Sequence, residues 1–118
     1  MRTMDILNET TSVPALGLPL HAVPGDELTA LAELGRFGGP DGRALEVGIW
    51  EMAPGTATDV EADELFVVIA GRAVVDFPDT GRRLDLAPGD VVRLSAGDRT
   101  VWTVSETLRK VYLTAAGD

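Results

Sequence analysis

Two stretches carry the strongest fold signal, E-L-F-V-V-I-A-G at residues 64–71 and P-G-D-V-V-R-L-S-A-G-D-R-T-V-W-T at residues 88–103. Both join runs of apolar and β-branched residues to turn sequences rich in Gly, Pro and Asp, which is the pattern of short strands between tight turns. Similar segments lie at 44–52, 64–69, 72–77, 82–86, 91–94, 99–104 and 108–114. Strands at this spacing predict an all-β sandwich or barrel.

The composition is that of one globular domain with a strong acidic excess. The chain has 118 residues, with 19 acidic against 10 basic side chains and a formal net charge of −9. Because this field repels phosphates and anionic headgroups, we expect no nucleic-acid and no membrane partner. The absence of cysteine excludes disulfides and thiolate chemistry. No apolar run approaches the roughly 20 residues that span a bilayer, and a cytoplasmic location is the default expectation.

Residues 1–43 differ in character from residues 44–118, which contain the predicted strands. Thr, Ser, Pro and Gly among residues 8–25 indicate an extended arm. Asp26 is positioned to cap a short helical turn, because Leu28, Leu31 and Leu34 recur at three-residue spacing. The glycines from Gly35 onwards then end any regular element. We expect this N-terminal part to pack on the barrel, and the arm to add a strand to a second copy in a homodimer.

Side-chain alternation along the predicted strands identifies an inner lining. Glu64 shares a face with Phe66 in segment 64–69, and both faces of that segment are apolar beyond Glu64, which predicts a strand covered on both sides. Segment 99–104 places Thr100 and Trp102 on one face. Segment 108–114 places Lys110 and Tyr112 on one face, opposite Arg109. If these faces point inward, they line a pocket rather than a solid core.

From about residue 48 to 113 the chain resembles the cupin superfamily, and within it small proteins similar to the cupin domain of (S)-ureidoglycine aminohydrolase. The resemblance is carried by G-I-W-E at 48–51, by Glu64 followed at Gly71, by P-G-D at 88–90 before S-A-G at 95–97, and by T-V-W at 100–102 with R-K-V-Y at 109–112. It implies a jelly-roll β-barrel of the cupin type with an N-terminal arm outside it.

The resemblance breaks down at the metal site. Where cupin motifs usually carry histidines, this chain has Thr58, Val60 and Thr100, and its single histidine is His21. If the loop is one residue longer, Ala57 and Asp59 take the first two positions. Of the usual ligands only Glu64 remains, whereas such metals need three or four converging ligands. We therefore predict no metal and no cofactor.

Glu64 is the candidate catalytic residue, because a carboxylate that points into a barrel can serve as general acid or base. Lys110 lies on the face of Tyr112 and could meet Glu64 or a ligand carboxylate, and a surface or dimer-interface salt bridge is its alternative. The candidate substrate-binding residues are those at former ligand positions, the aromatic side chains and the lysine: Thr58, Thr100, Trp50, Trp102, Tyr112 and Lys110.

Three functions stay open on this basis. The first is metal-independent binding of a small polar metabolite in the lumen, with possible isomerase, lyase or hydrolase chemistry by Glu64. The second is a non-catalytic ligand-binding or regulatory cupin in which Glu64 and Lys110 close a salt bridge. The third is a metalloenzyme like ureidoglycine aminohydrolase, with Asp59 or Glu61 joining Glu64 as unusual ligands.

Overall fold

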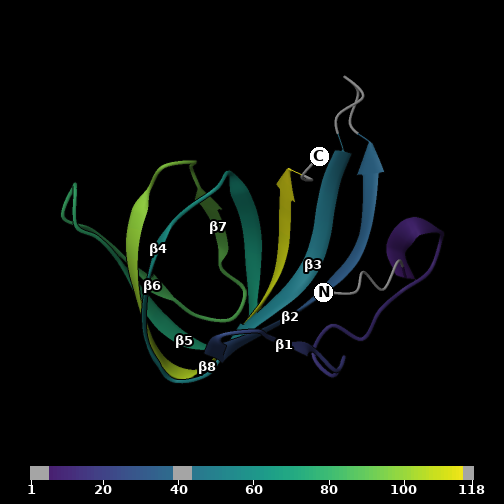
Figure 1. Ribbon diagram of the computed structural model, residues 1–118, viewed down its shortest axis with the longest axis horizontal. Coiled ribbons are helices and arrows are strands. Elements are labelled where there is room, and N and C mark those ends of the chain that lie inside the picture. Colours follow the sequence, from purple (N-terminus) through teal and green to yellow (C-terminus); the bar gives the residue numbers. More distant parts are fainter. Residues whose placement is uncertain (1–5, 39–43, 116–118) are drawn as a thin grey trace.

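The computed structural model describes residues 6–38 and 44–115, which form one antiparallel sheet of eight strands and a single turn of 3₁₀ helix. The elements are η1 (Ile6–Asn8), β1 (His21–Val23), β2 (Asp26–Gly38), β3 (Ala44–Met52), β4 (Gly55–Val60), β5 (Glu64–Phe77), β6 (Arg82–Leu86), β7 (Val91–Leu94) and β8 (Arg99–Ala115). The strand order is β1-β2-β3-β8-β5-β6, with β4 paired to β8 and β7 paired to β5. In Figure 1 the sheet bends so that β4, β6 and β7 lie on one side and β2 and β3 on the other. The predicted all-β jelly roll is confirmed.

Two long strands form the spine of this sheet. Segments 64–69 and 72–77, predicted as separate strands, are the single strand β5, and segments 99–104 and 108–114 are the single strand β8. The pairing of β5 with β8 shifts register between Val68 and Ala73, where the chain bends instead of turning back. Gly71 lies at this bend with φ 90°, and a Cβ there would overlap the carbonyl oxygen of Thr107. Only glycine meets both requirements.

The helical turn predicted after Asp26 is wrong, because residues 26–38 form strand β2. Its backbone pairs with β3 from Thr29 opposite Met52 to Gly38 opposite Ala44, and it continues through the glycine at 35 with a register shift. Strand pairing thus overrides the three-residue leucine spacing. The Asp26 carboxylate still bonds locally, accepting from the Leu28 amide at 3.0 Å and from the Thr29 hydroxyl at 2.6 Å.

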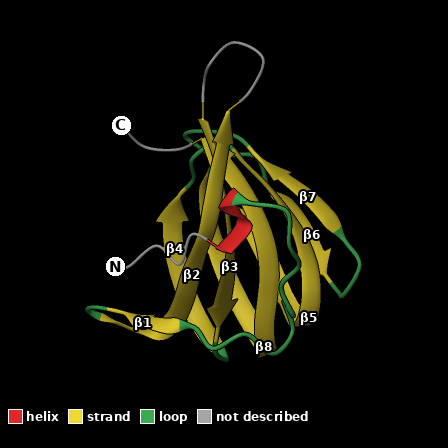
Figure 2. Cartoon of the chain, turned by 90° about the vertical axis from the view of Figure 1, so that its right-hand side faces the viewer, coloured by secondary structure: helices red, strands yellow, loops and turns green. Residues whose placement is uncertain are grey.

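The N-terminal segment packs on the convex side of the sheet, where it closes a second apolar cluster, the outer core. Figure 2 shows η1 and the following loop lying across this side, in front of β3 and β8. The buried residues of the outer core are Leu18, Ala32, Leu34, Val47 and Ile49, and those packed against them include Ile6, Leu7, Val13, Ala15, Leu20, Val111 and Leu113. β1 pairs with β2 of the same chain. Addition of the arm to a second copy stays a prediction.

A larger apolar cluster, the lumen core, fills much of the interior. Its members are Met52, Phe66, Val68, Ala73, Val75, Leu86, Val92, Leu94, Trp102, Val104, Leu108 and Tyr112. The described residues leave much of the opposite face of β5 open, since Leu65 is 42% and Val67 36% exposed, and only Ile69 on that face is half-buried. The prediction that this strand is covered on both sides is therefore wrong for the single chain. Within the described residues, no helix has the length and apolar character needed to cross a membrane.

Candidate functional site

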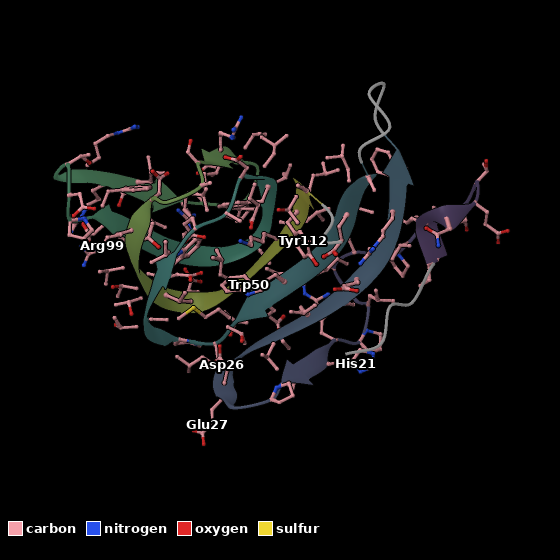
Figure 3. All side chains as sticks on the ribbon, turned by 45° about the horizontal axis from the view of Figure 1, so that its top comes forward. His21, Asp26, Glu27, Trp50, Arg99 and Tyr112 are labelled. Carbon is pink, nitrogen blue, oxygen red and sulfur yellow. The ribbon has the colours of Figure 1, made fainter. Side chains whose placement is uncertain are left out.

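A cavity of about 380 Å³ opens inside the curve of the sheet, at the end of the lumen core. The lining includes aromatic rings, carboxylates and one basic side chain: Trp50, Trp102, Tyr112, Asp26, Asp59, Glu61, Glu64 and Lys110. Figure 3 shows Trp50 and Tyr112 within the curve of the sheet, whereas His21 lies apart on β1. A cavity of this size with a few convergent polar groups suits a small ligand.

The floor of the cavity is a buried ion pair between Lys110 and Glu64. The Lys110 ammonium donates to Glu64 Oε2 at 2.6 Å, with side-chain exposures of 6% and 18%. Lys110 lies in β8 and Glu64 is the first residue of β5, so the pair joins the two spine strands. The alternation of side chains allowed this contact as one of the alternatives for Lys110. The alternative of a surface salt bridge for Lys110 is wrong, because the lysine is buried.

Aromatic rings complete the surroundings of the Lys110 ammonium. Its nitrogen lies 4.2 Å from the ring centroid of Phe66, 4.5 Å from that of Trp50 and 5.1 Å from that of Trp102. All three distances are within the range of cation–π attraction. Glu64 and the rings of Trp50, Phe66 and Trp102 together form the ammonium cage. Phe66 was not among the predicted site residues, although its two-residue spacing from Glu64 places it on the same face.

Glu61 is a second fixed carboxylate at the cavity. Its Oε2 accepts hydrogen bonds from the Thr100 hydroxyl at 2.7 Å and from the Trp102 indole N–H at 3.0 Å. Both donors are neutral, so they orient the carboxylate without compensating its charge. The sequence places Glu61 only within an acidic loop, and its role depends on the strand pairing that brings β8 beside it.

Of Thr100 and Thr58, the two threonines at former ligand positions, only Thr58 lines the cavity, and its contact with a ligand stays a prediction. Thr100 is 2% exposed, its hydroxyl is bonded to Glu61, and it is not among the cavity-lining residues. Thr58 lies at the cavity rim with an exposed side chain. It pairs with Val101, so its side chain lies on the sheet face opposite that of Trp102. Thr100 is a positioning residue for Glu61.

Tyr112 is held in place by β3. It lies directly across from Gly48, where a Cβ would overlap the tyrosine ring. Its hydroxyl donates to Glu46 Oε2 at 3.0 Å. Burial, followed by the negative charge of Glu46, raises the pKa of Tyr112 well above its ordinary value. The phenol therefore stays protonated and acts as a fixed donor rather than as a base.

The residues at this site do not fit a cupin-type metal ion. No group of three or more His, Cys, Asp or Glu side chains in the described part of the chain could hold one. Glu64, the remaining member of the usual ligand set, is bonded to an ammonium, and Glu61 is bonded to two neutral donors. A cation already next to the carboxylate disfavours a second one at the same place.

A jelly roll of antiparallel strands around a ligand-sized lumen defines a cupin. Within that class, the chain belongs to the EutQ-like cupin domain family, whose model matches residues 39–112. The match includes every cavity-lining residue of β3, β4, β5 and β8. The predicted membership of the cupin superfamily is confirmed, and the nearer resemblance to ureidoglycine aminohydrolase stays a prediction.

Solved structures share the fold at low sequence identity. The Clostridium difficile EutQ protein is 19% identical, with a TM-score of 0.65 over 91% of this chain and 87% of that chain. The polyketide cyclase RemF from Streptomyces resistomycificus is 21% identical, with a TM-score of 0.68 over 92% of this chain and 81% of that chain. A cupin superfamily protein from Desulfitobacterium hafniense DCB-2 is 16% identical, with a TM-score of 0.59 over 81% and 84%. A comparison with curated proteins gives no significant match.

Proposed function

We propose that this protein binds a small polar molecule in its lumen without a metal ion. The observation that carries the proposal is the buried ion pair of Lys110 and Glu64 at the cavity floor, in a place where a cupin usually gathers metal ligands. The pair presents a positive donor and a carboxylate to the same small cavity. Trp50 and Trp102 add flat apolar walls, and such rings bury a ligand's carbon skeleton effectively.

The charges of the lining indicate what kind of molecule fits. An ammonium has three N–H donors, and within the described residues Lys110 bonds only to Glu64. Its other donors suit a ligand oxygen such as a hydroxyl, carbonyl or amide oxygen. Asp59 and Glu61 also line the cavity, and no basic side chain of the described part forms a salt bridge with either. These carboxylates accept from ligand donors and repel anions, which favours a neutral or cationic ligand.

Acid–base catalysis by Glu64 is the second candidate function. Its support is that Glu64 lines the cavity and keeps 18% of its side chain exposed despite the ion pair, so a bound molecule can reach the carboxylate. Isomerase, lyase or hydrolase chemistry would use such a group. If the protein has no turnover, the Glu64–Lys110 ion pair has only a structural role in a binding protein. The variant Glu64→Gln distinguishes the enzyme from the binding protein. Lost turnover at unchanged ligand affinity identifies an enzyme.

Matched neutral and anionic probes test whether the cavity prefers neutral to anionic ligands. The protein contains two tryptophans, both at the cavity, so tryptophan fluorescence reports binding directly. We expect lactamide and glycerol to bind more tightly than lactate and glycerate. Glu61→Gln should narrow that difference, because it removes one repelling charge. Glu106→Gln is the matched control, since Glu106 is exposed and pairs with Arg72 at 3.9 Å. Tighter binding of the carboxylates would contradict the proposed ligand class.

A further inference from the structure

Lys110 is the only lysine of the chain, and apart from His21 every other basic residue is an arginine. An arginine carries a broad planar fork, whereas a lysine carries a compact point charge on a flexible stem. The ammonium cage surrounds such a point charge, with one carboxylate oxygen at 2.6 Å and ring centroids at 4.2, 4.5 and 5.1 Å. The chain therefore places its single lysine where the geometry suits an ammonium group.

We propose that the ammonium cage is a binding site for a primary ammonium group and that Lys110 is its resident occupant. The cage recognises the ammonium in two ways that do not depend on the lysine stem. Glu64 supplies the opposite charge, and the faces of Trp50, Phe66 and Trp102 attract a cation. The centre of the lumen thus carries a fixed cation of the protein's own. This inference is independent of which ligand the lumen binds.

Removing the lysine stem should convert the tethered cation into an exchangeable one. Lys110→Ala deletes three methylene groups and the ammonium, which n-propylammonium replaces atom for atom. We expect n-propylammonium at millimolar concentration to raise the melting temperature of Lys110→Ala and to change the fluorescence of Trp50 and Trp102. The neutral isostere 1-propanol should do neither at the same concentration. The double variant Lys110→Ala/Glu64→Gln should bind n-propylammonium at least about tenfold more weakly, because a charge-assisted bond is lost.

Lys110→Met is the control for effects outside the cage. Its side chain fills the same volume without a charge, so n-propylammonium should leave this variant unchanged. Equal responses of Lys110→Ala to n-propylammonium and 1-propanol, or equal responses of Lys110→Ala and Lys110→Met to n-propylammonium, would overturn the proposal. If Lys110→Ala folds only when n-propylammonium is present, and not with 1-propanol, the proposal is supported in its strongest form.

The wild-type protein gives a test that does not depend on a variant folding. Isotope-labelled lysine produces one side-chain spin system, because the chain has one lysine. With three ring faces around the ammonium, we expect the ε-methylene protons of Lys110 to be shifted upfield from those of free lysine by ring currents. Signals at the position of free lysine would overturn the proposal, since they would show that the cage does not close on the ammonium.

Discussion

Arg109 and Lys110 are neighbours in β8, yet they belong to different regions of the molecule. Arg109 lies on the convex side, where it donates to Glu51 at 3.1 Å, to the Ala15 carbonyl at 2.7 Å and to the Leu18 carbonyl at 3.2 Å. Lys110 lies in the lumen, where Glu64 is its hydrogen-bond partner within the described residues. One basic residue fastens the N-terminal segment over the outer core, and the other supplies charge to a cavity.

The number of protein acceptors distinguishes a structural cation from a candidate functional one. The guanidinium of Arg109 has several protein acceptors from distant parts of the chain, which leaves little for a ligand. Lys110 keeps donors that no described residue accepts, beside a cavity that a ligand can enter. We therefore expect changes at Lys110 to alter stability and binding together, and changes at Arg109 to alter stability alone.

The largest expected effect is that of Lys110→Met on stability. The change leaves the Glu64 carboxylate without its partner in a mostly buried site, which should lower the free energy of unfolding by about 3 kcal/mol. Adding Glu64→Gln in the double variant should recover most of that loss, because the unpaired charge disappears. Urea unfolding of the two single variants and the double variant measures the coupling. A loss below about 1 kcal/mol would mean that solvent compensates the pair.

Arg109→Ala should have the next largest effect, and it tests the other half of the comparison. Loss of the charge-assisted bonds to Ala15 and Leu18 should reduce the free energy of unfolding by about 2 kcal/mol and expose residues 13–20 to proteases. Tryptophan fluorescence and probe binding should not change, because both tryptophans lie on the lumen side. Weakened binding in this variant would contradict the separation between the two regions.

Tyr112 allows a pH test on the lumen side, since it is the only tyrosine. Its pKa is raised in the folded protein, mainly by burial and by Glu46, so folding favours the protonated phenol. The associated stability is complete below the unfolded pKa of about 10 and is lost as pH rises above it. We expect no tyrosinate absorbance near 295 nm at pH 10.5 until the protein unfolds. Tyr112→Phe should remove the signal, and ordinary titration near pH 10 in folded protein would contradict the buried contact with Glu46.

The prediction with the smallest expected effect on the stability of the single chain is that the protein forms a homodimer. β1 is the first strand in the sheet order and so offers an edge, while Leu65, Val67 and Val91 remain exposed on the convex face of β5 and β7. Either surface could pair two copies, and exposed edges and apolar patches commonly do. Light scattering after size exclusion measures the mass. A monomer at micromolar concentration would contradict the homodimer prediction.

Much of the fold could be predicted from the sequence because strand and turn signals are local. Segments 44–52, 82–86 and 91–94 match β3, β6 and β7 to the residue. The alternation also placed Lys110 on the face of Tyr112, opposite Arg109. β2 was missed because leucines spaced by three residues fit a helix locally, and only pairing with β3 decides otherwise. β4 was missed because its sequence G-T-A-T-D-V carries a weak apolar signal.

The cupin frame, the absence of the usual histidines and the inward position of Glu64 could all be predicted before the structure, because they follow from residue type, order and the two-residue period of a strand. The groups that replace the histidines became visible only in the folded chain. The ammonium cage joins β3, β5 and β8, and Glu61 reaches Thr100 across 39 positions of the chain. Such contacts depend on how strands curve and pair, and a linear sequence does not specify that curvature at any single position.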